Sequence, residues 1–397
     1  CGLRKAHSTQ HALFRLLQDW HNELDNSGFV GTILMDLSKA YDCLPHDLLI
    51  AKFEAYGIDK TGLNLLLDYL SNRKQRTKIN SSYSDWYDIV RGVPQGSILG
   101  PLLFNLYVND LFLFVERTQI CNFADDNTIY SCDNNLNTIL QDLQHDMKVI
   151  LNWFKINSMK PNPKKFQFMI LGKAKREPIL LKINLIEIKE SSTVVLLGLT
   201  IDSCLTFKNH IDILCRNANY KLHALRRIRK YLSPGKAKIL YNAFINSQFS
   251  YASIIWMFCR KTDYLKMEKI QYKGLKIVYN SNESYENLLL YSNEVSIHQK
   301  HLRQLATEVY KSLTNLSPEF IQPFFTIKDI PYNLRNRHML KLPRARSTFH
   351  GTNSVQFRAC LMWNGLSLSL KESRSVHEFK SNMIRMINID CSCKICG

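Results

Sequence analysis

The chain has 397 residues, 45% of them hydrophobic, which is ample apolar material for the cores of two or three domains. No run of 18 uncharged apolar residues occurs, because the longest apolar stretch, residues 99–115, is interrupted by Asn105, Asn109 and Asp110, so a membrane span is not expected. The net charge of +18 is uneven: residues 1–154 carry 13 Lys and Arg against 18 Asp and Glu, whereas the other 243 residues carry 39 against 16. This basic excess favours nucleic acid as a partner over a merely solubilising surface.

The termini and the cysteines give weaker indications. The chain begins with Cys1 and shows no basic-then-apolar signal segment, so we expect a fragment of a longer protein with reduced thiols, located inside the cell in the nucleus or cytoplasm. Cys391, Cys393 and Cys396 are spaced closely enough to bind zinc, but a tetrahedral site needs a fourth ligand. His377 is the nearest histidine and is distant in sequence, so the alternative is a frayed tail without metal.

The apolar pattern predicts alternating helices and strands. Apolar residues recur at helical spacing over 9–24, behind Ser8 or Thr9 as a cap, and the β-branched run 29–35 predicts a buried strand that ends at Asp36. Further helices are expected at 47–56, 60–70, 97–115, with Ser97 as the cap, and 136–157. Further strands are expected at 73–79, 86–90, 120–124, 128–131, 166–171 and 194–201.

The order of these elements indicates the fold class. A turn-rich loop covers 91–97, and from residue 209 the chain is helical and basic to at least residue 279. Strands and helices alternate before that point, which predicts an α+β layer: a mixed sheet with helices on one face.

Two chain segments place carboxylates at strand ends. Asp125, Asp126 and Asn127 are expected in the turn of a hairpin, and Asp36 follows the strand at 29–35. If these strands are neighbours, two or three carboxylates meet, and they resist ionising together unless a hard cation such as Mg²⁺ is bound. Two such ions about 3.5–4 Å apart suit a phosphoryl transfer. An Asp-Asp pair alone is more often simple turn chemistry.

Three sequence motifs give these carboxylates a context. Residues 35–42, 91–101 and 123–126 resemble, in order and spacing, the catalytic motifs of reverse transcriptases from non-LTR (LINE-like) retrotransposons of the jockey and CR1 kind. Residues 2–10, 162–167 and 196–202 resemble further motifs of that family. The resemblance is strong to about residue 205 and looser beyond it.

The resemblance implies a right-hand polymerase fold of the α+β class. A palm with a mixed or antiparallel sheet and helices on one face would be followed by a helical thumb and a C-terminal region. The expected divisions are a remnant of the fingers at 1–28, the palm at 29–205, the thumb at 206–290 and a basic C-terminal region at 291–397. The endonuclease and most of the fingers are expected to be missing from this fragment.

The resemblance also implies an activity and its metal ligands. The chain would be an RNA-directed DNA polymerase that joins a deoxynucleotide to a primer 3′-hydroxyl. Asp36, Asp125 and Asp126 would hold two Mg²⁺ ions, with Mn²⁺ as a possible substitute, and the backbone carbonyl of Leu37 would add a ligand. Tyr41 would be a steric gate that rejects ribonucleotides, or else a plain core residue.

The remaining site residues follow from the same resemblance. Gln95 would contact the incoming nucleotide, and Gly96 would let the backbone approach it closely. Lys165 would protonate the leaving pyrophosphate, or else be a solvated lysine. Asp42, which follows Tyr41, is expected to cap a helical turn that begins near Pro45; the alternative is that it binds metal.

Two basic segments would contact the template and primer. Arg226, Arg227, Arg229 and Lys230 would track phosphates from the helical stretch 221–238. A second basic patch consists of Arg335, Arg337, Lys341, Arg344 and Arg346. The implied partners are an RNA template, a DNA primer and dNTP, without a membrane.

Two other functions compete with the polymerase. One is a catalytically inert retrotransposon remnant that only binds nucleic acid. The other is a metal-dependent nuclease that uses the same carboxylates, but it leaves Gln95 and Tyr41 without roles.

Overall fold

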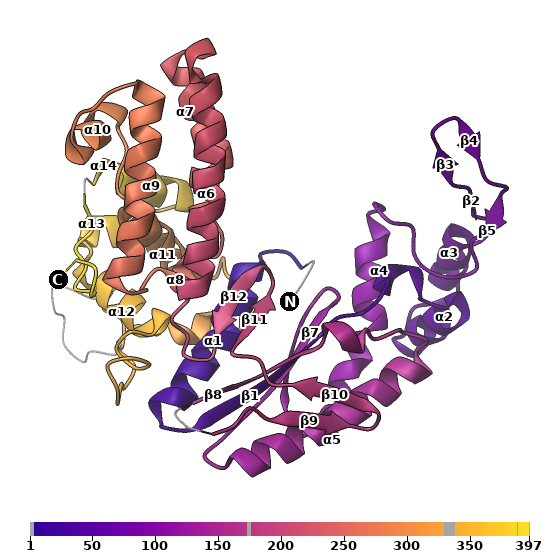
Figure 1. Cartoon of the computed structure of the whole chain (residues 1–397). Helices are drawn as coiled ribbons and strands as arrows, with labels where there is room; N and C mark the ends of the chain where they lie inside the picture. Colours follow the sequence, from indigo (N-terminus) through magenta and orange to yellow (C-terminus); the bar gives the residue numbers. More distant parts are fainter. Residues whose placement is uncertain (1–3, 173–175, 329–337, 387, 397) are drawn as a thin grey trace. The chain divides into compact units, whose positions relative to one another are not determined.

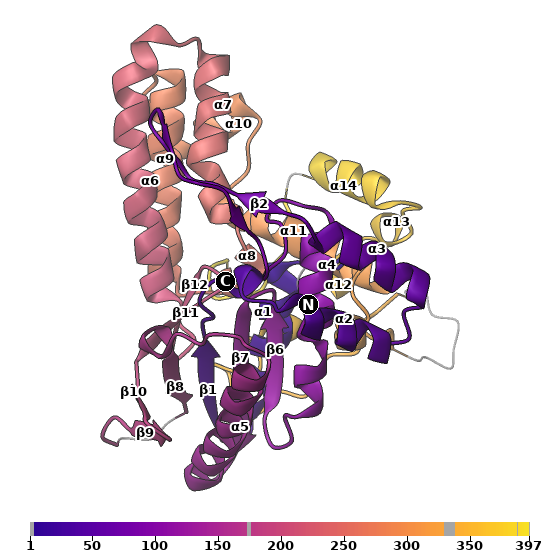
Figure 2. The same ribbon diagram turned by 90° about the vertical axis from the view of Figure 1, so that its right-hand side faces the viewer.

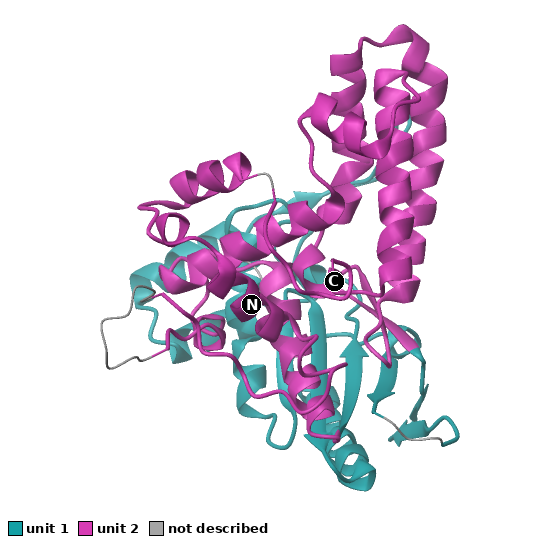
Figure 3. Cartoon of the chain, turned by 90° about the vertical axis from the view of Figure 1, so that its left-hand side faces the viewer, with its two compact units in different colours: residues 1–5, 29–192 teal, residues 6–28, 193–397 magenta. Residues whose placement is uncertain are grey.

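A computed structural model describes the chain except for residues 1–3, 173–175, 329–337, 387 and 397. The chain divides into two compact units, residues 1–5 with 29–192 (unit 1) and residues 6–28 with 193–397 (unit 2), which Figure 3 shows in teal and magenta. None of the described helices is long and apolar enough to cross a membrane.

Unit 1 is built on a four-stranded sheet in the order β6-β7-β1-β8 (Figure 2). Its strands are β1 (Phe29–Met35), β6 (Gln119–Phe123), β7 (Asp126–Asp133) and β8 (Gln167–Leu171). Every pairing within this sheet is antiparallel. The mixed sheet predicted from the order of the elements is therefore wrong, whereas the antiparallel alternative that the resemblance implies agrees with the structure. The α+β class of the unit is confirmed.

Helix α5 (Leu136–Ile156) covers one face of the sheet because its apolar stripe is continuous. Ile139, Leu143, Met147 and Ile150 are fully buried in the core of unit 1. Gly31 on β1 permits the close packing: a Cβ there would lie 2.4 Å from Cγ2 of Ile139. A larger residue at position 31 would push α5 away from the sheet.

A buried carboxylate joins α5 to the start of β6. Asp146 is 0% exposed, and its Oδ2 accepts hydrogen bonds from the backbone N–H groups of Arg117 and Thr118 and from the Thr118 hydroxyl. Burial opposes ionisation, but the hydrogen bonds from His145, Thr118 and Arg117 hold the pKa of Asp146 below its usual range. The strand that leads to Asp125 is thereby fixed at its beginning.

The helices that precede the β6–β7 hairpin form where the sequence predicts them, but one of them is shorter than predicted. Helices α2 (His46–Ala55) and α3 (Lys60–Leu70) lie where they are expected. Helix α4 (Leu99–Tyr107) ends earlier than expected, and a 3₁₀ turn, Asn109–Leu113, follows it. Ser97 does contribute a cap, because its Oγ accepts a hydrogen bond from the N–H of Gly100 at 2.9 Å.

The strand pair expected at 73–79 and 86–90 forms an exposed hairpin with shorter ladders. Strand β2 (Lys74–Gln75) pairs with β5 (Tyr87–Asp88), and β3 (Lys78–Ile79) pairs with β4 (Ser82–Tyr83). The returning strand therefore begins at Ser82, before the expected position.

The sequence pattern does not predict two further hairpins. Strands β9 (Leu180–Ile183) and β10 (Ile186–Lys189) form a hairpin in unit 1 that the pattern did not predict. The single strand expected at 194–201 is a hairpin of β11 (Thr193–Leu196) and β12 (Leu199–Asp202) in unit 2. Leu197 and Gly198, with φ of 47° and 77°, make its turn.

Unit 2 is mainly helical, as the sequence predicts for residues after 209. In Figure 1 the helices α6, α7 and α9 run side by side. Helix α1 belongs to this unit, and Nε2 of its His11 lies 3.0 Å from Oε2 of Glu308 on α11. The helices are α1 (Thr9–Asp25), α6 (Lys208–Ile228), α7 (Pro234–Phe244), α8 (Ser253–Trp256), α9 (Lys261–Tyr279), α10 (Tyr285–Ser292), α11 (Ile297–Leu313), α12 (Val355–Gly365), α13 (Leu368–Lys371) and α14 (Val376–Arg385).

Candidate functional site

The strand register of unit 1 determines where its three candidate aspartates lie. Met35 of β1 is paired with Asn127 of β7, so Asp36 and Asp126 follow at the same end of this antiparallel ladder. Phe123 is paired with Asp126, so the hairpin turn consists only of Ala124 and Asp125. Asp126 is therefore the first residue of β7, and its expected position within the turn is wrong.

Hydrogen bonds below the turn hold Asp125 in place. Nδ2 of Asn122 donates to Oδ1 of Asn127 at 2.6 Å, and Nδ2 of Asn127 donates to the carbonyl oxygen of Asp125 at 3.1 Å. Ala124 adopts a φ of 55°, a left-handed conformation that a side chain disfavours. The turn is thus strained at Ala124, and the hydrogen bonds of Asn122 and Asn127 stabilise the backbone that carries the Asp125 carboxylate.

The three carboxylates influence one another electrostatically. Burial raises the pKa of Asp126, and the negative charges of Asp125 and Asp36 raise it further. Nζ of Lys165 lies 3.0 Å from Oδ2 of Asp36. One ammonium group therefore offsets part of the negative charge of the cluster.

The segment that carries Lys165 is attached to the end of β1 through backbone hydrogen bonds. The N–H of Asn162 donates to the carbonyl oxygen of Asp36 at 2.9 Å, and the N–H of Ser38 donates to the carbonyl oxygen of Lys160 at 2.8 Å. Leu37, which is buried between them, forms an isolated antiparallel bridge with Pro161. Lys165 and Asp36, far apart in sequence, are thereby kept adjacent.

Tyr41 lies between the carboxylates and the core. Its ring stacks on that of Phe104, with 4.5 Å between the centroids. Burial raises the pKa of the Tyr41 hydroxyl, and the charge of Asp125 raises it further, so the phenol stays protonated at neutral pH. The side chain is half-buried, with its ring packed on Phe104 and its hydroxyl within the electrostatic influence of Asp125.

The loop at 91–97 is attached to the segment that carries Tyr41. The N–H of Val93 donates to the carbonyl oxygen of Tyr41 at 3.0 Å, and Nε2 of the exposed Gln95 donates to Oδ1 of Asp42 at 2.9 Å. Asp42 does not cap α2, which begins after Pro45 without a side-chain cap, so that expectation is wrong. Asp42 instead orients Gln95, a partnership that the sequence did not reveal.

The backbone conformation at position 96 favours glycine, although no neighbouring atom of the chain would clash with a side chain there. Its φ is 78°, and a Cβ there would meet no atom within 4 Å. The conformation favours glycine, while the space around the Cβ position is open.

The basic residues of α6 meet two further lysines on α9. Arg226, Arg229 and Lys230 line a surface hollow of about 630 Å³ together with Lys273 and Lys276. These lysines lie outside the stretch 221–238 that is predicted to contact phosphates, although α9 carries basic residues at helical spacing. Arg227 is exposed outside this lining.

Arg229 differs from its neighbours because its guanidinium is engaged inside the unit. It donates hydrogen bonds to the carbonyl oxygens of Ile277 and Val278 at the end of α9, and to that of Leu232. In the second basic patch, Lys341, Arg344 and Arg346 are exposed, whereas Arg335 and Arg337 lie outside the described residues.

The three C-terminal cysteines gather as the zinc hypothesis requires, but with a different histidine. Cys391, Cys393 and Cys396 lie with His298 of α11, while His377 is exposed on α14. The fourth potential ligand is therefore a histidine distant in sequence, and not His377, the histidine nearest to the cysteines along the chain.

Known proteins match the part of the chain that contains the carboxylates. The family described as reverse transcriptase (RNA-dependent DNA polymerase) matches residues 1–201, slightly more than half of the chain. A probable RNA-directed DNA polymerase from transposon BS of Drosophila melanogaster is 26% identical over 295 residues, which are 70% of this chain and 32% of that protein. The RNA-directed DNA polymerase from mobile element jockey of Drosophila funebris is 24% identical over 285 residues, 69% of this chain and 31% of that protein.

The similarity to curated proteins extends over only part of their length. The chain spans about one third of the curated relatives that it matches. Among solved structures, apo telomerase from Candida tropicalis is 13% identical, with a TM-score of 0.39 over 79% of this chain and 55% of that chain, a likeness too low to support an argument. The match over residues 1–201 and the curated relatives together show that the chain belongs to the reverse transcriptase family, in its LINE-like, non-LTR retrotransposon branch.

Proposed function

We propose that the chain is the polymerase part of a retrotransposon reverse transcriptase, which joins deoxynucleotides to a DNA primer on an RNA template. The observation that carries the proposal is the convergence of Asp36, Asp125 and Asp126 at one end of the β1–β7 ladder. In this interpretation the sheet of unit 1 is the palm of a right-hand polymerase, and the helical region of residues 206–290, which includes α6, α7 and α9, is the thumb.

The carboxylate cluster suits divalent metal ions. Three hard oxygen donors lie close enough that two of them raise the pKa of the third, Asp126, and this repulsion is what a bound cation relieves. Asp36, Asp125 and Asp126 would hold the ions, Mg²⁺ or Mn²⁺, with the Leu37 carbonyl as a further donor. Bound there, the ions would neutralise charge on the attacking and leaving oxygens.

The protein's own side chains would orient the reactants. Tyr41, fixed by its stacking on Phe104, would present its ring where a ribose 2′-hydroxyl projects. Gln95, held by Asp42, would contact the nucleotide. Lys165 would give a proton to the leaving pyrophosphate, from a position that its ion pair with Asp36 already defines.

Primer extension on an RNA template tests this proposal directly. The full chain with Mg²⁺ is expected to incorporate dNTP, and Asp125→Asn is expected to abolish incorporation because it removes one carboxylate charge while preserving the shape of the side chain. Asp133→Asn is the matched control, since Asp133 is the last residue of β7, at the end of the strand opposite to the turn that holds Asp125. Extension by the Asp125 variant at the wild-type rate would refute the assigned chemistry.

A second candidate function is nucleic-acid binding without catalysis, and the basic hollow between α6 and α9 favours it. Lys273→Glu combined with Lys276→Glu is expected to weaken binding of a template–primer duplex and to reduce its salt dependence. Lys208→Glu is the control, because Lys208 begins α6, about 30 Å from the helix end that carries Arg226. An electrophoretic shift that depends on this hollow, with no dNTP incorporation by the wild-type chain, would favour the binding-only function.

A further inference from the structure

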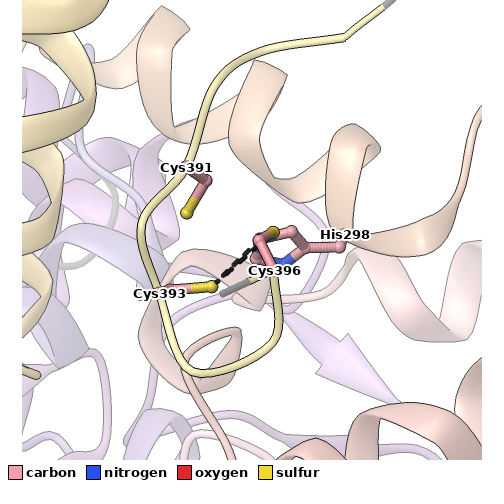
Figure 4. A group of neighbouring side chains, drawn as sticks. All are labelled: His298, Cys391, Cys393 and Cys396. Carbon is pink, nitrogen blue, oxygen red and sulfur yellow. Dashed lines mark hydrogen bonds between the residues drawn. The ribbon is translucent and has the colours of Figure 1, made fainter.

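The C-terminal tail and helix α11 bring four metal-binding side chains together. His298 is the second residue of α11, and Cys391, Cys393 and Cys396 follow more than ninety residues later. One ligand atom from each of the four residues lies within 4.8 Å of all the others. Figure 4 shows the side chains converging on one small volume, with the tail curving around it.

The spacing of these atoms approximates a tetrahedral zinc site. Zn–S bonds of about 2.3 Å and Zn–N bonds of about 2.0–2.1 Å require S···S separations of about 3.8 Å and S···N separations of about 3.6 Å. Sγ of Cys393 lies 3.9 Å from Sγ of Cys396 and 3.4 Å from Nε2 of His298. Both pairs are therefore within a few tenths of an ångström of the edges of such a tetrahedron.

The tail is held beside α11 by contacts that do not involve the sulfur atoms. Gln299 exchanges two hydrogen bonds with the backbone of Ile389, at 2.8 and 3.1 Å. Arg303 donates to the carbonyl oxygen of Met386 at 2.7 Å, and Arg358 donates to that of Ser392 at 2.9 Å. The ligands on both sides are thus positioned before any ion binds, which lowers the entropic cost of binding.

The histidine is also oriented for this role. His298 is 3% exposed, and its ring packs edge-on against that of Tyr264, with 5.6 Å between the centroids. Nε2 faces Cys393, while Nδ1 is buried without a hydrogen-bond partner among the described atoms. Ring packing therefore sets the direction in which Nε2 points.

A disulfide or a catalytic cysteine would explain the positions of these four side chains less completely than a metal site does. A disulfide between Cys393 and Cys396 would leave Cys391 and the aimed His298 without roles. A catalytic nucleophile would need access to its substrate, but Cys393 is only 2% exposed.

From these contacts we propose that His298, Cys391, Cys393 and Cys396 bind one structural zinc ion that fastens the C-terminal tail to helix α11. Three thiolates and an imidazole select a soft or borderline metal such as zinc over Mg²⁺. Because four protein ligands complete the tetrahedron, no coordination position remains for a substrate, so the site is structural. It lies in unit 2, apart in sequence and in chemistry from the carboxylate cluster of unit 1.

Metal content of the full chain, purified under reducing conditions without affinity tags that bind metal, tests the proposal. Inductively coupled plasma mass spectrometry is expected to find about one zinc per chain after dialysis against metal-free buffer. Replacement by Co²⁺ is expected to give the intense visible absorption of tetrahedral cobalt thiolate. Cys396→Ser is expected to lower the zinc content and to weaken that absorption, and because Cys396 is exposed this variant should still fold.

Cys204→Ser is the matched control, since Cys204 is an exposed thiol of the same unit outside the cluster, and it is expected to keep the metal. His298→Gln removes the one ligand contributed by α11, and it is expected to shift the cobalt spectrum if the chain folds. A fully reduced wild-type chain that holds no stoichiometric zinc and shows no cobalt–thiolate absorption would overturn the proposal. Zinc content that is equal in the wild type and Cys396→Ser would overturn it as well.

Discussion

Met35 of β1 is paired with Asn127 of β7, and this single register relation places Asp36 beside Asp126. Because side chains alternate across a strand, a shift of one residue in this ladder would turn one of the carboxylates to the opposite face of the sheet. The register is in turn fixed by the core, since Ile33 is paired with Ile129 and both are fully buried. Hydrophobic packing thus determines the geometry of the candidate metal site.

The charge of Asp126 is expected to destabilise unit 1 when no metal is bound. Its pKa is raised in the folded chain, so the folded state holds its proton more tightly than the unfolded state does. The free energy of unfolding therefore falls as the pH rises from the ordinary carboxyl range through the raised pKa. Asp126→Asn is expected to have a higher Tm than the wild type at neutral pH in EDTA, and the difference should vanish in acid.

Thermal denaturation of both chains between acid and neutral pH checks this expectation. Added Mg²⁺ is expected to stabilise the wild type more than Asp126→Asn and so to reduce the difference. Asp68→Asn, which neutralises an exposed carboxylate on α3, provides the control and should show neither effect. A lower Tm for Asp126→Asn at neutral pH would contradict the repulsion inferred for the cluster.

Lys165 is expected to affect catalysis far more than folding. The ion pair with Asp36 is solvent-accessible, with side chains 63% and 34% exposed, so Lys165→Met should change the free energy of unfolding by about 1 kcal/mol or less. If Lys165 is the general acid, kcat should fall by about 10²–10⁴-fold with little change in the KM for dNTP. If Lys165 is the general acid, the wild-type rate should fall at alkaline pH as the lysine loses its proton. This fall should be absent from the pH–rate profile of Lys165→Met.

Lys164 precedes Lys165 in a 3₁₀ turn, Pro163–Lys165. Lys164→Met is therefore the control, because it removes one positive charge from the same turn. A variant of Lys165 that keeps its kcat and changes only its dependence on Mg²⁺ would assign the lysine to neutralising Asp36 instead.

The elements nearest the site were predictable because each depends on local patterning. The run 29–35 is β-branched and apolar and ends abruptly at a carboxylate, and β1 has those same bounds. Helix α5 follows from its apolar period, and α3 has the predicted bounds, with Asp59 as its N-terminal cap in the structure. The carboxylates meet only if β1 and β7 are neighbours, and the ladder between these two strands satisfies that condition.

The features that escaped prediction depend on contacts between distant residues or on unusual backbone angles. Leu197 adopts a positive φ that its residue type disfavours, so a hairpin looked like one continuous strand. A two-residue turn at Ala124 and Asp125 was not distinguishable from a longer one. His298 was missed because only the packing of the tail on α11 brings it to the cysteines.

Tyr41 is expected to control discrimination between sugars through the bulk of its ring. Tyr41→Ala should raise the ratio of kcat/KM for ribonucleotides to that for deoxynucleotides by about 10–200-fold, if rejection of the 2′-hydroxyl is comparable to the discrimination that a pocket achieves against one extra methylene. Tyr41→Phe retains the stacking on Phe104 and should keep the wild-type ratio. Single-nucleotide incorporation kinetics measure both, and equal ratios for all three chains would show that Tyr41 is a packing residue only.

The two glycines of the loop at 91–97 should respond differently to alanine. Gly96 has a φ of 78° and open space at its Cβ position, so Gly96→Ala should cost only the backbone strain, about 1–2 kcal/mol. Gly92 has a φ of 85°, and a Cβ there would lie 2.8 Å from Cα of Asp42, so Gly92→Ala should cost more. Chemical denaturation measures both losses.

Nucleotide binding separates two explanations for Gly96. If the incoming nucleotide approaches its backbone, Gly96→Ala should raise the KM for dNTP beyond what its modest loss of stability explains. Gly96→Asn is the informative companion, because asparagine tolerates a positive φ better than alanine but still fills the space. A KM that is restored in Gly96→Asn would assign the need for glycine to backbone conformation, whereas a KM that stays high would assign it to contact with the nucleotide.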